Sequence, residues 1–158
     1  MDETQDAYKL AYDEAVRALS QQQSVLDNFR TRGGILLSAA AIATSFLGGQ
    51  ALRQGSMSTW SWLAVLGFVG LSASALLILW PRKEWEFAAI PRRLISIYIE
   101  TEEPFSVERI HRDLALHMQD SYDKNESRLG WLIVYFRIAV ILLTAEVLAW
   151  VIDIASRS

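Results

Sequence analysis

Two opposite charges, Arg137 and Glu146, interrupt the otherwise apolar segment YFRIAVILLTAEVLAW at residues 135–150. Inside a membrane, ionisable side chains are rare and mark ion paths, proton relays or contacts between subunits. The two residues are nine positions apart, so on one helix they point to opposite faces, about 13 Å apart along the axis. They cannot neutralise each other there, and each needs a partner of its own.

Other residues capable of chemistry are few. His111 and His117 are six positions apart, so they lie about 120° apart around a helix and cannot share a metal as an i, i+4 pair would. The chain has no cysteine, and no Ser/His/Asp set is plausible because both histidines fall on one predicted helix. We therefore expect a protein that is not an enzyme and that uses no cofactor or metal.

Charge and composition narrow the class of protein further. The chain has 158 residues and a net charge of -3, which argues against a nucleic-acid partner because such binders usually carry a basic excess. Its acidic N-terminus, MDETQDAYKLAYDE, lacks the basic region and short apolar core of a signal peptide. We expect any membrane segment to act as its own insertion signal.

Three apolar blocks, at residues 33–52, 60–80 and 130–152, are long enough to cross a bilayer as helices. The first two contain no ionisable residue. The tryptophans fall at or just beyond the block ends, as in interfacial belts; they are Trp60, Trp62, Trp80, Trp85, Trp131 and Trp150. The sequence predicts an all-α integral membrane bundle with three transmembrane helices, long cytoplasmic helical extensions and an oligomeric state.

Basic residues near the block ends predict the orientation in the membrane. They cluster before the first block, after the second and before the third: Arg30, Arg32, Arg82, Lys83, Lys124 and Arg128. This pattern predicts a cytoplasmic N-terminus, a cytoplasmic segment 81–129 and an outer C-terminus. If the third block only dipped into the bilayer, both termini would be inside.

Residues 1–32 are predicted to form a cytoplasmic amphipathic helix that runs directly into the first span. Mostly apolar positions recur at heptad spacing along one seam: Tyr8, Tyr12, Ala15, Leu19, Gln22, Leu26 and Phe29. The polar Gln22 could fix the register of this seam. Packing on the chain's own second cytoplasmic helix and self-association both remain open.

The cytoplasmic segment 81–129 is punctuated by Pro81, Pro91 and Pro104. We expect a short helix within residues 87–100, a loop at 101–104, and Ser106 as the N-cap of a helix that continues into the third span. The inward positions of these helices are Leu94, Ile95, Tyr98, Ile110, Leu114, Met118, Tyr122 and Leu129.

Small residues form stripes on the first two spans and allow helix backbones to approach closely in lipid. They are Gly34, Ser38, Ala41, Ser45 and Gly49 on the first span, and Gly67, Gly70 and Ser74 on the second. Packing within one chain and packing between chains are both compatible with this pattern.

Each of the two charges, Arg137 and Glu146, could be neutralised or solvated in several ways. Arg137 lies about 10 Å from the predicted inner end of its span, at the limit of snorkelling. Glu146 lies about 9 Å from the outer end, where Arg53 and Gln50 could reach it, or it is protonated in a dry site. In a ring of subunits, one face of the third span would line a water-filled axis, or Arg137 and Glu146 would face neighbouring chains; local solvation without a transport role is the alternative.

Residues 26–49, LDNFRTRGGILLSAAAIATSFLGG, resemble the junction of helix and span in small bacterial membrane proteins of the SLATT type. LWPRKEWEF at 79–87, Asn125 and the final EVLAW are similar too, and the plan is similar to that of Pycsar transmembrane effectors. A third span departs from the two-span SLATT plan. The resemblance implies a bacterial inner-membrane effector that oligomerises and disrupts the membrane in anti-phage defence, triggered by a cytoplasmic sensor protein or a nucleotide second messenger.

We therefore expect a membrane effector or pore that is gated through its cytoplasmic helices. The alternative is a non-conducting membrane scaffold or anchor subunit whose helices bind a cytoplasmic partner. A small-molecule transporter is disfavoured because three spans offer no visible inverted repeat.

Overall fold

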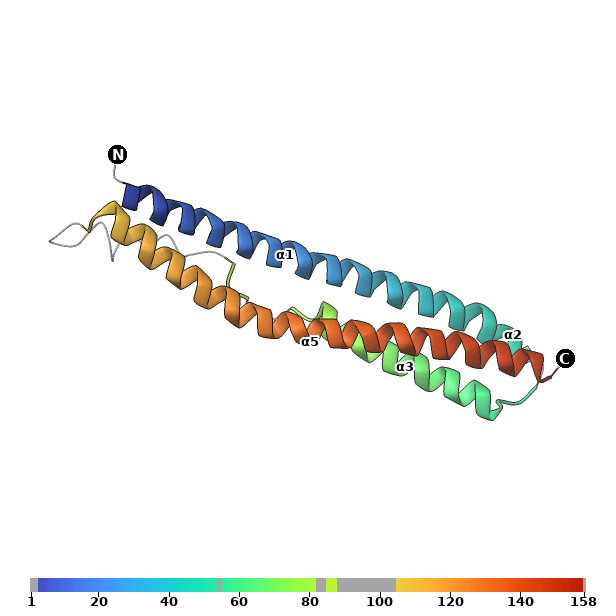
Figure 1. The fold of residues 1–158 in the computed structure, drawn as a ribbon. Coiled ribbons are helices and arrows are strands. Elements are labelled where there is room, and N and C mark those ends of the chain that lie inside the picture. The colour runs from blue at the N-terminus through green and yellow to red at the C-terminus, as the bar shows by residue number, and fades with distance from the viewer. Residues whose placement is uncertain (1–2, 54, 82–84, 88–104, 158) are drawn as a thin grey trace. The chain divides into compact units, whose positions relative to one another are not determined.

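The computed structural model describes residues 3–53, 55–81, 85–87 and 105–157, which form helices and short connections with no strand among them. The elements are α1 (Glu3–Ala43), a π-helix (Thr44–Gly48), α2 (Gly49–Arg53), α3 (Thr59–Leu79) and α5 (Val107–Ala155), as drawn in Figure 1. The all-helical fold class predicted from the sequence is confirmed.

Three helical stretches are long and apolar enough to cross a membrane: Gln5–Arg53, Thr59–Leu79 and Val107–Ala155. The first runs through α1, the π-helix and α2 without a break, as expected from the absence of a helix breaker before residue 33. The second begins at a capping box, in which Ser58 accepts bonds from the Trp60 and Ser61 amides and the Ser61 hydroxyl accepts from the Ser58 amide.

The chain divides into two compact units, which are described separately. Unit 1 comprises Met1–Leu26 and Arg82–Leu129, and unit 2 comprises Asp27–Pro81 and Gly130–Ser158. Each unit therefore contains one part of α1 and one part of α5, and α3 belongs to unit 2 alone.

In unit 1 the predicted seam of α1 packs against α5 of the same chain. Leu19, Gln22 and Leu26 are buried, and the Tyr12 ring stacks on His111 at a centroid distance of 5.6 Å. The Gln22 Nε2 atom donates to the Tyr122 carbonyl at 3.0 Å. Of the two packing partners open to the seam, the structure therefore shows the intramolecular one.

The α5 part of unit 1 starts at the predicted cap, where the Ser106 hydroxyl accepts a hydrogen bond from the Arg109 amide at 3.4 Å. Further along, Asn125 Nδ2 donates to the Glu86 carbonyl at 2.9 Å and fixes the short segment 85–87 against the helix. The expected helix within 87–100, the loop at 101–104 and the basic pair at 82–83 fall outside the described residues, except that Phe87 itself is not helical.

In unit 2, α1, α3 and α5 pack through small side chains. One fully buried layer consists of Ala40, Leu71 and Ala139, one from each helix, and a second cluster of Ala51, Ala64, Ala149 and Trp150 lies nearer the C-terminal end. Figure 1 shows α3 alongside the C-terminal part of α5 in this unit. Because Ala40 and Ala139 carry only a methyl group, α1 and α5 can pack closely around Leu71 of α3.

Trp150 departs from the predicted belt of interfacial tryptophans, since it is one of the largest fully buried side chains. Its ring packs against Gly48: a Cβ added there would stand 3.1 Å from the ring atom Cζ2. The other described tryptophans of the spans are exposed, namely Trp60, Trp62, Trp80 and Trp131. Position at a block end therefore predicted the location of Trp150 along its helix but not the face on which it lies.

Candidate functional site

The Glu146 side chain lies in the interior of unit 2, with 0% of its surface exposed. It projects from α5 toward the π-helix, where the Thr44 hydroxyl donates a hydrogen bond to its Oε1 atom. The sequence suggested Arg53 and Gln50 as partners at the end of the first span, but both are exposed. The hydrogen-bond partner of Glu146 is therefore Thr44 and neither of those two residues.

The π-helix gives Thr44 and Gly48 their positions. A π-helix closes its hydrogen bonds one residue later than an α-helix and is found frequently at functional sites. Here it directs Thr44 to the Glu146 carboxyl and brings the bare Gly48 against the Trp150 ring, one turn further along α5. From the other side, Gly67 of α3 allows the backbone of α5 to approach at Glu146.

Two polar atoms in this site have no hydrogen-bond partner among the described residues: Oε2 of Glu146 and Nε1 of Trp150. The indole lies beside the carboxyl, yet the N–H does not form a bond of ordinary geometry with it. One atom is an acceptor and the other a donor, so the site contains an unused complementary pair in a buried setting.

Arg137 lies on the opposite side of α5 and is exposed. Its neighbours on that face are apolar and exposed as well, among them Ile138 and Ile141. No ion pair involves Arg137 among the residues that the structure describes. The prediction that Arg137 and Glu146 point to opposite faces and do not pair within the chain is confirmed.

A second polar cluster lies at the C-terminal end of unit 2 and was missed by the sequence analysis. Asp153 is 0% exposed, and its carboxyl accepts hydrogen bonds from Ser58, from Ser61 at 2.7 Å and from Arg157 Nε at 3.0 Å. Arg157 also donates to the Ser61 hydroxyl at 3.3 Å and to the Ala51 carbonyl at 3.4 Å. The cluster therefore ties the end of α5 to α2 and to the start of α3.

Asp153 follows the apolar block 130–152, and its hydrogen bonds decide its charge. Burial by itself raises the pKa of the Asp153 carboxyl, but the bonds from Ser58, Ser61 and Arg157, with the charge of Arg157, outweigh burial and hold that pKa below its ordinary value. Asp153 is therefore ionised at neutral pH. The spacing of Asp153 and Arg157, four residues apart at a helix end, is the signal that could have revealed the pair.

The small-residue stripes of the two spans have different surroundings. On α3, Gly67 and Ser74 are buried and Gly70 contacts Leu142, so this stripe packs inside the chain. On the first span, Gly34 is half-buried, and an added Cβ at Gly34 or Gly49 would meet nothing within 4 Å. The other members of that stripe, Ser38, Ala41 and Ser45, are exposed along with Gly49.

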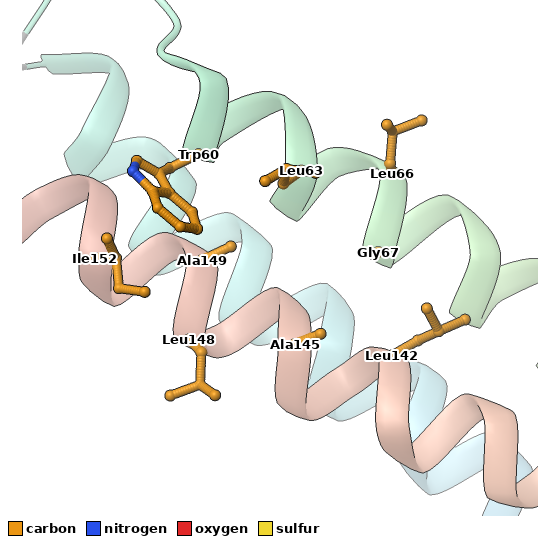
Figure 2. Close-up of a pocket in the computed structure, with 9 residues that line it drawn as sticks. All are labelled: Trp60, Leu63, Leu66, Gly67, Leu142, Ala145, Leu148, Ala149 and Ile152. Atoms are coloured by element: carbon orange, nitrogen blue, oxygen red, sulfur yellow. The ribbon is translucent and has the colours of Figure 1, made fainter.

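An open apolar groove of about 530 Å³ lies between α3 and α5 (Figure 2). Trp60 and Ile152 stand at one end of it, and Gly67 and Leu142 at the other. The remaining lining residues are Leu63, Leu66, Ala145, Leu148 and Ala149. The groove has no charged side chain, so it does not extend the polar site around Glu146.

Within the described ranges, no group of three His, Cys, Asp or Glu side chains is arranged to hold a metal ion. No family model matches the chain, and no curated protein or solved structure matches it either.

Proposed function

We propose that this chain is a bacterial inner-membrane effector that oligomerises and permeabilises the bilayer in anti-phage defence, in response to a cytoplasmic signal. The observation that carries the proposal is the exposure of Arg137 on α5, within an apolar stretch. A cation at the centre of a membrane helix costs about 3 kcal/mol. Contact with another subunit or with a water-filled axis would remove that cost.

The outward face of the first span supports self-association. Ser38, Ala41 and Ser45 are exposed, and the two hydroxyls bond back to their own helix, to the Gly34 and Ala41 carbonyls. These three side chains are small, and both hydroxyls are satisfied within their own helix. Such a face suits close packing against a helix of a second copy in lipid.

The interior of unit 2 supports a pore that is formed between chains rather than within one. The layer of Ala40, Leu71 and Ala139 is 0% exposed and closes the space between the three helices. Water needs polar partners to occupy a protein interior. In an oligomer, a conducting path would therefore run between the chains, where Arg137 would face the water.

Dye release from vesicles containing the purified protein tests the pore. Wild type should release the dye, Arg137→Leu should lose most of the release, and Arg137→Lys should retain it because the charge is kept. The exposed Arg17→Leu outside the spans serves as the matched control. Equal release by wild type and Arg137→Leu, at equal reconstitution, would exclude the pore role of Arg137.

The orientation and the location of the signal are also proposals. We propose a cytoplasmic N-terminus and a C-terminus on the outer side, with a sensor protein or a nucleotide second messenger acting on unit 1. Since the chain has no cysteine, single cysteines at Gln5 and Ser156 report the side of each terminus when spheroplasts are labelled with an impermeant maleimide. We expect labelling of Ser156→Cys and no labelling of Gln5→Cys. Labelling of Gln5→Cys alone would show that the N-terminus is on the outer side instead.

The alternative function, a non-conducting scaffold, is favoured by exposed apolar side chains on unit 1. Leu10 is 63% exposed and Leu116 59% exposed, although neither belongs to the seam that packs α1 on α5. Exposed leucines on otherwise polar helices are typical of protein-binding surfaces when they form a patch. One stoichiometric partner that is lost in Leu10→Glu, together with no dye release by the wild type when that partner is present, would establish the scaffold instead of the pore.

A further inference from the structure

The Glu146 carboxyl is enclosed, and no cation among the described residues compensates it. On the first helical stretch the facing group is the Thr44 hydroxyl, and Arg53 at its end is exposed. On α3 no residue between 59 and 79 is titratable. On α5 itself, Arg137 lies on the opposite face, and Asp153 is seven residues away and bonded to Arg157.

Burying an ionised carboxylate without a cation costs several kcal/mol, whereas a neutral carboxylic acid with one hydrogen bond is tolerated. The observed arrangement suits the neutral acid: Thr44 donates to Oε1, and Oε2 has no donor facing it in bonding geometry. The unpartnered indole N–H of Trp150 beside it is what an ionised carboxylate would need.

We infer that Glu146 is an intramembrane proton-binding site with two states that differ in the hydrogen bond of Trp150. In the protonated state the proton is on Oε2 and the Trp150 N–H is unpartnered. When Glu146 releases its proton to water, the N–H bond of Trp150 donates to Oε2, so that Thr44 and Trp150 together stabilise the carboxylate.

The π-helix couples this change to the packing of the first span. The Trp150 ring packs directly on Gly48, since a Cβ added at Gly48 would stand only 3.1 Å from Cζ2 and 3.2 Å from Cη2 of the indole. A movement of the ring would therefore change the packing at Gly48. Thr44 and Gly48 bound the same π-helix. The constant hydrogen bond at Thr44 and the changing contact at Trp150 therefore act on one five-residue segment, independently of whether the protein forms a pore.

Infrared spectroscopy of the full chain in lipid, titrated from acid to alkaline pH, tests the inference through the carbonyl stretch of a buried protonated carboxyl. Wild type should show a band that disappears as pH rises, and Glu146→Gln should lack it. Trp150→Phe should keep the band but lose it about one pH unit higher, because the ionised form has one donor fewer. Asp153→Asn should leave the midpoint unchanged.

Two results would overturn the inference. One is the absence of a Glu146-dependent band at every pH, and the other is an identical midpoint in Trp150→Phe and wild type. A midpoint that moves with sodium concentration at constant ionic strength would show a metal-cation site and overturn the proton site as well. If Glu146→Gln does not fold, the test is the difference between wild type and Trp150→Phe in the pH midpoint at which the band disappears.

Discussion

Gly67 of α3 lies directly against Glu146 of α5: a Cβ added at Gly67 would stand 3.2 Å from the Glu146 Cβ and 3.5 Å from its Cα. The same Cβ would be 3.5 Å from the Leu142 carbonyl oxygen. The absence of a side chain at residue 67 therefore allows α3 to approach the backbone of α5 where the buried carboxyl leaves the helix.

Replacing Gly67 by leucine should destabilise unit 2 by roughly 2 kcal/mol, because the larger side chain would have to push α3 away from α5. Thermal unfolding in detergent measures the change. Gly49→Leu is the matched control, since an added Cβ at Gly49 meets nothing within 4 Å. Equal melting temperatures for the two variants would contradict the close approach.

Enlarging the outward face of the first span should disrupt the proposed oligomer and leave the fold of the chain intact. In the double variant Ser38→Leu, Ala41→Leu, both new side chains extend from exposed positions. Mass measurement of the detergent-solubilised complex should then show a smaller species with an unchanged melting temperature. The control is Ile35→Leu, which conserves volume at an exposed site of the same helix; an unchanged mass for the double variant would place the interface elsewhere.

Removing the carboxyl of Asp153 should destabilise unit 2 by roughly 2 kcal/mol, because charged hydrogen bonds are lost and Arg157 is left without its anion. Asp153→Ala is compared with wild type by thermal unfolding. Asp120→Ala serves as the control, because Asp120 pairs with Lys124 at 2.7 Å on an exposed surface where no measurable change is expected. Similar effects of both variants would argue against a structural role of the buried cluster.

Acidification should weaken the same cluster in a defined direction. Hydrogen bonds hold the pKa of Asp153 below its ordinary value, despite burial, so the folded state favours the ionised form. Its stabilising contribution is complete above the unfolded pKa, at about pH 4, and is lost as pH falls through the lower folded pKa. Asp153→Asn should lack this loss, so the stability difference between wild type and Asp153→Asn should shrink below about pH 4. A stability difference between the two proteins that does not change with pH would contradict the lowered pKa of Asp153.

Gln22 should be replaceable by leucine without loss of stability. Its Nε2 donates to the Tyr122 carbonyl at 3.0 Å, but its Oε1 is buried with no partner within the described part of the chain. An apolar side chain of similar size removes that unsatisfied atom, and we expect a gain of up to about 1 kcal/mol. A loss larger than that in chemical unfolding would mean that Gln22 contributes more than one ordinary hydrogen bond.

The helices and their buried faces were predictable because they depend on local spacing. The heptad pattern from Tyr8 to Leu26 identified the face of α1 that packs in unit 1, and block length identified the three membrane-length helices. Gln22 was expected in the seam, but its partner, the Tyr122 carbonyl, is 100 residues away and could not be read from spacing. Sequence spacing defines a face and leaves the identity of the contacting helix open.

The hydrogen-bond partners of the two buried carboxyls, Glu146 and Asp153, could not be predicted from the sequence, for a different reason. Thr44 reaches Glu146 because residues 44–48 form a π-helix, and nothing in TSFLG distinguishes that form from an ordinary α-helix. Asp153, Ser58 and Ser61 each lie at the end of an apolar block, where polar residues are normally solvated, so their burial was not expected. Both sites depend on which segments of different helices meet in three dimensions.

The π-helix at 44–48 also determines where the first span can tolerate a change in length. A π turn contains one residue more than the α turn it replaces, so deleting one residue there would restore an ordinary helix and keep Ala40 and Ala51 on their present faces. The same deletion anywhere from 34 to 39 would rotate Gly33 by about 100° relative to Ala40 and move it away from Ile78. Among natural variants of this chain, single-residue deletions in the first span should therefore concentrate in this one segment.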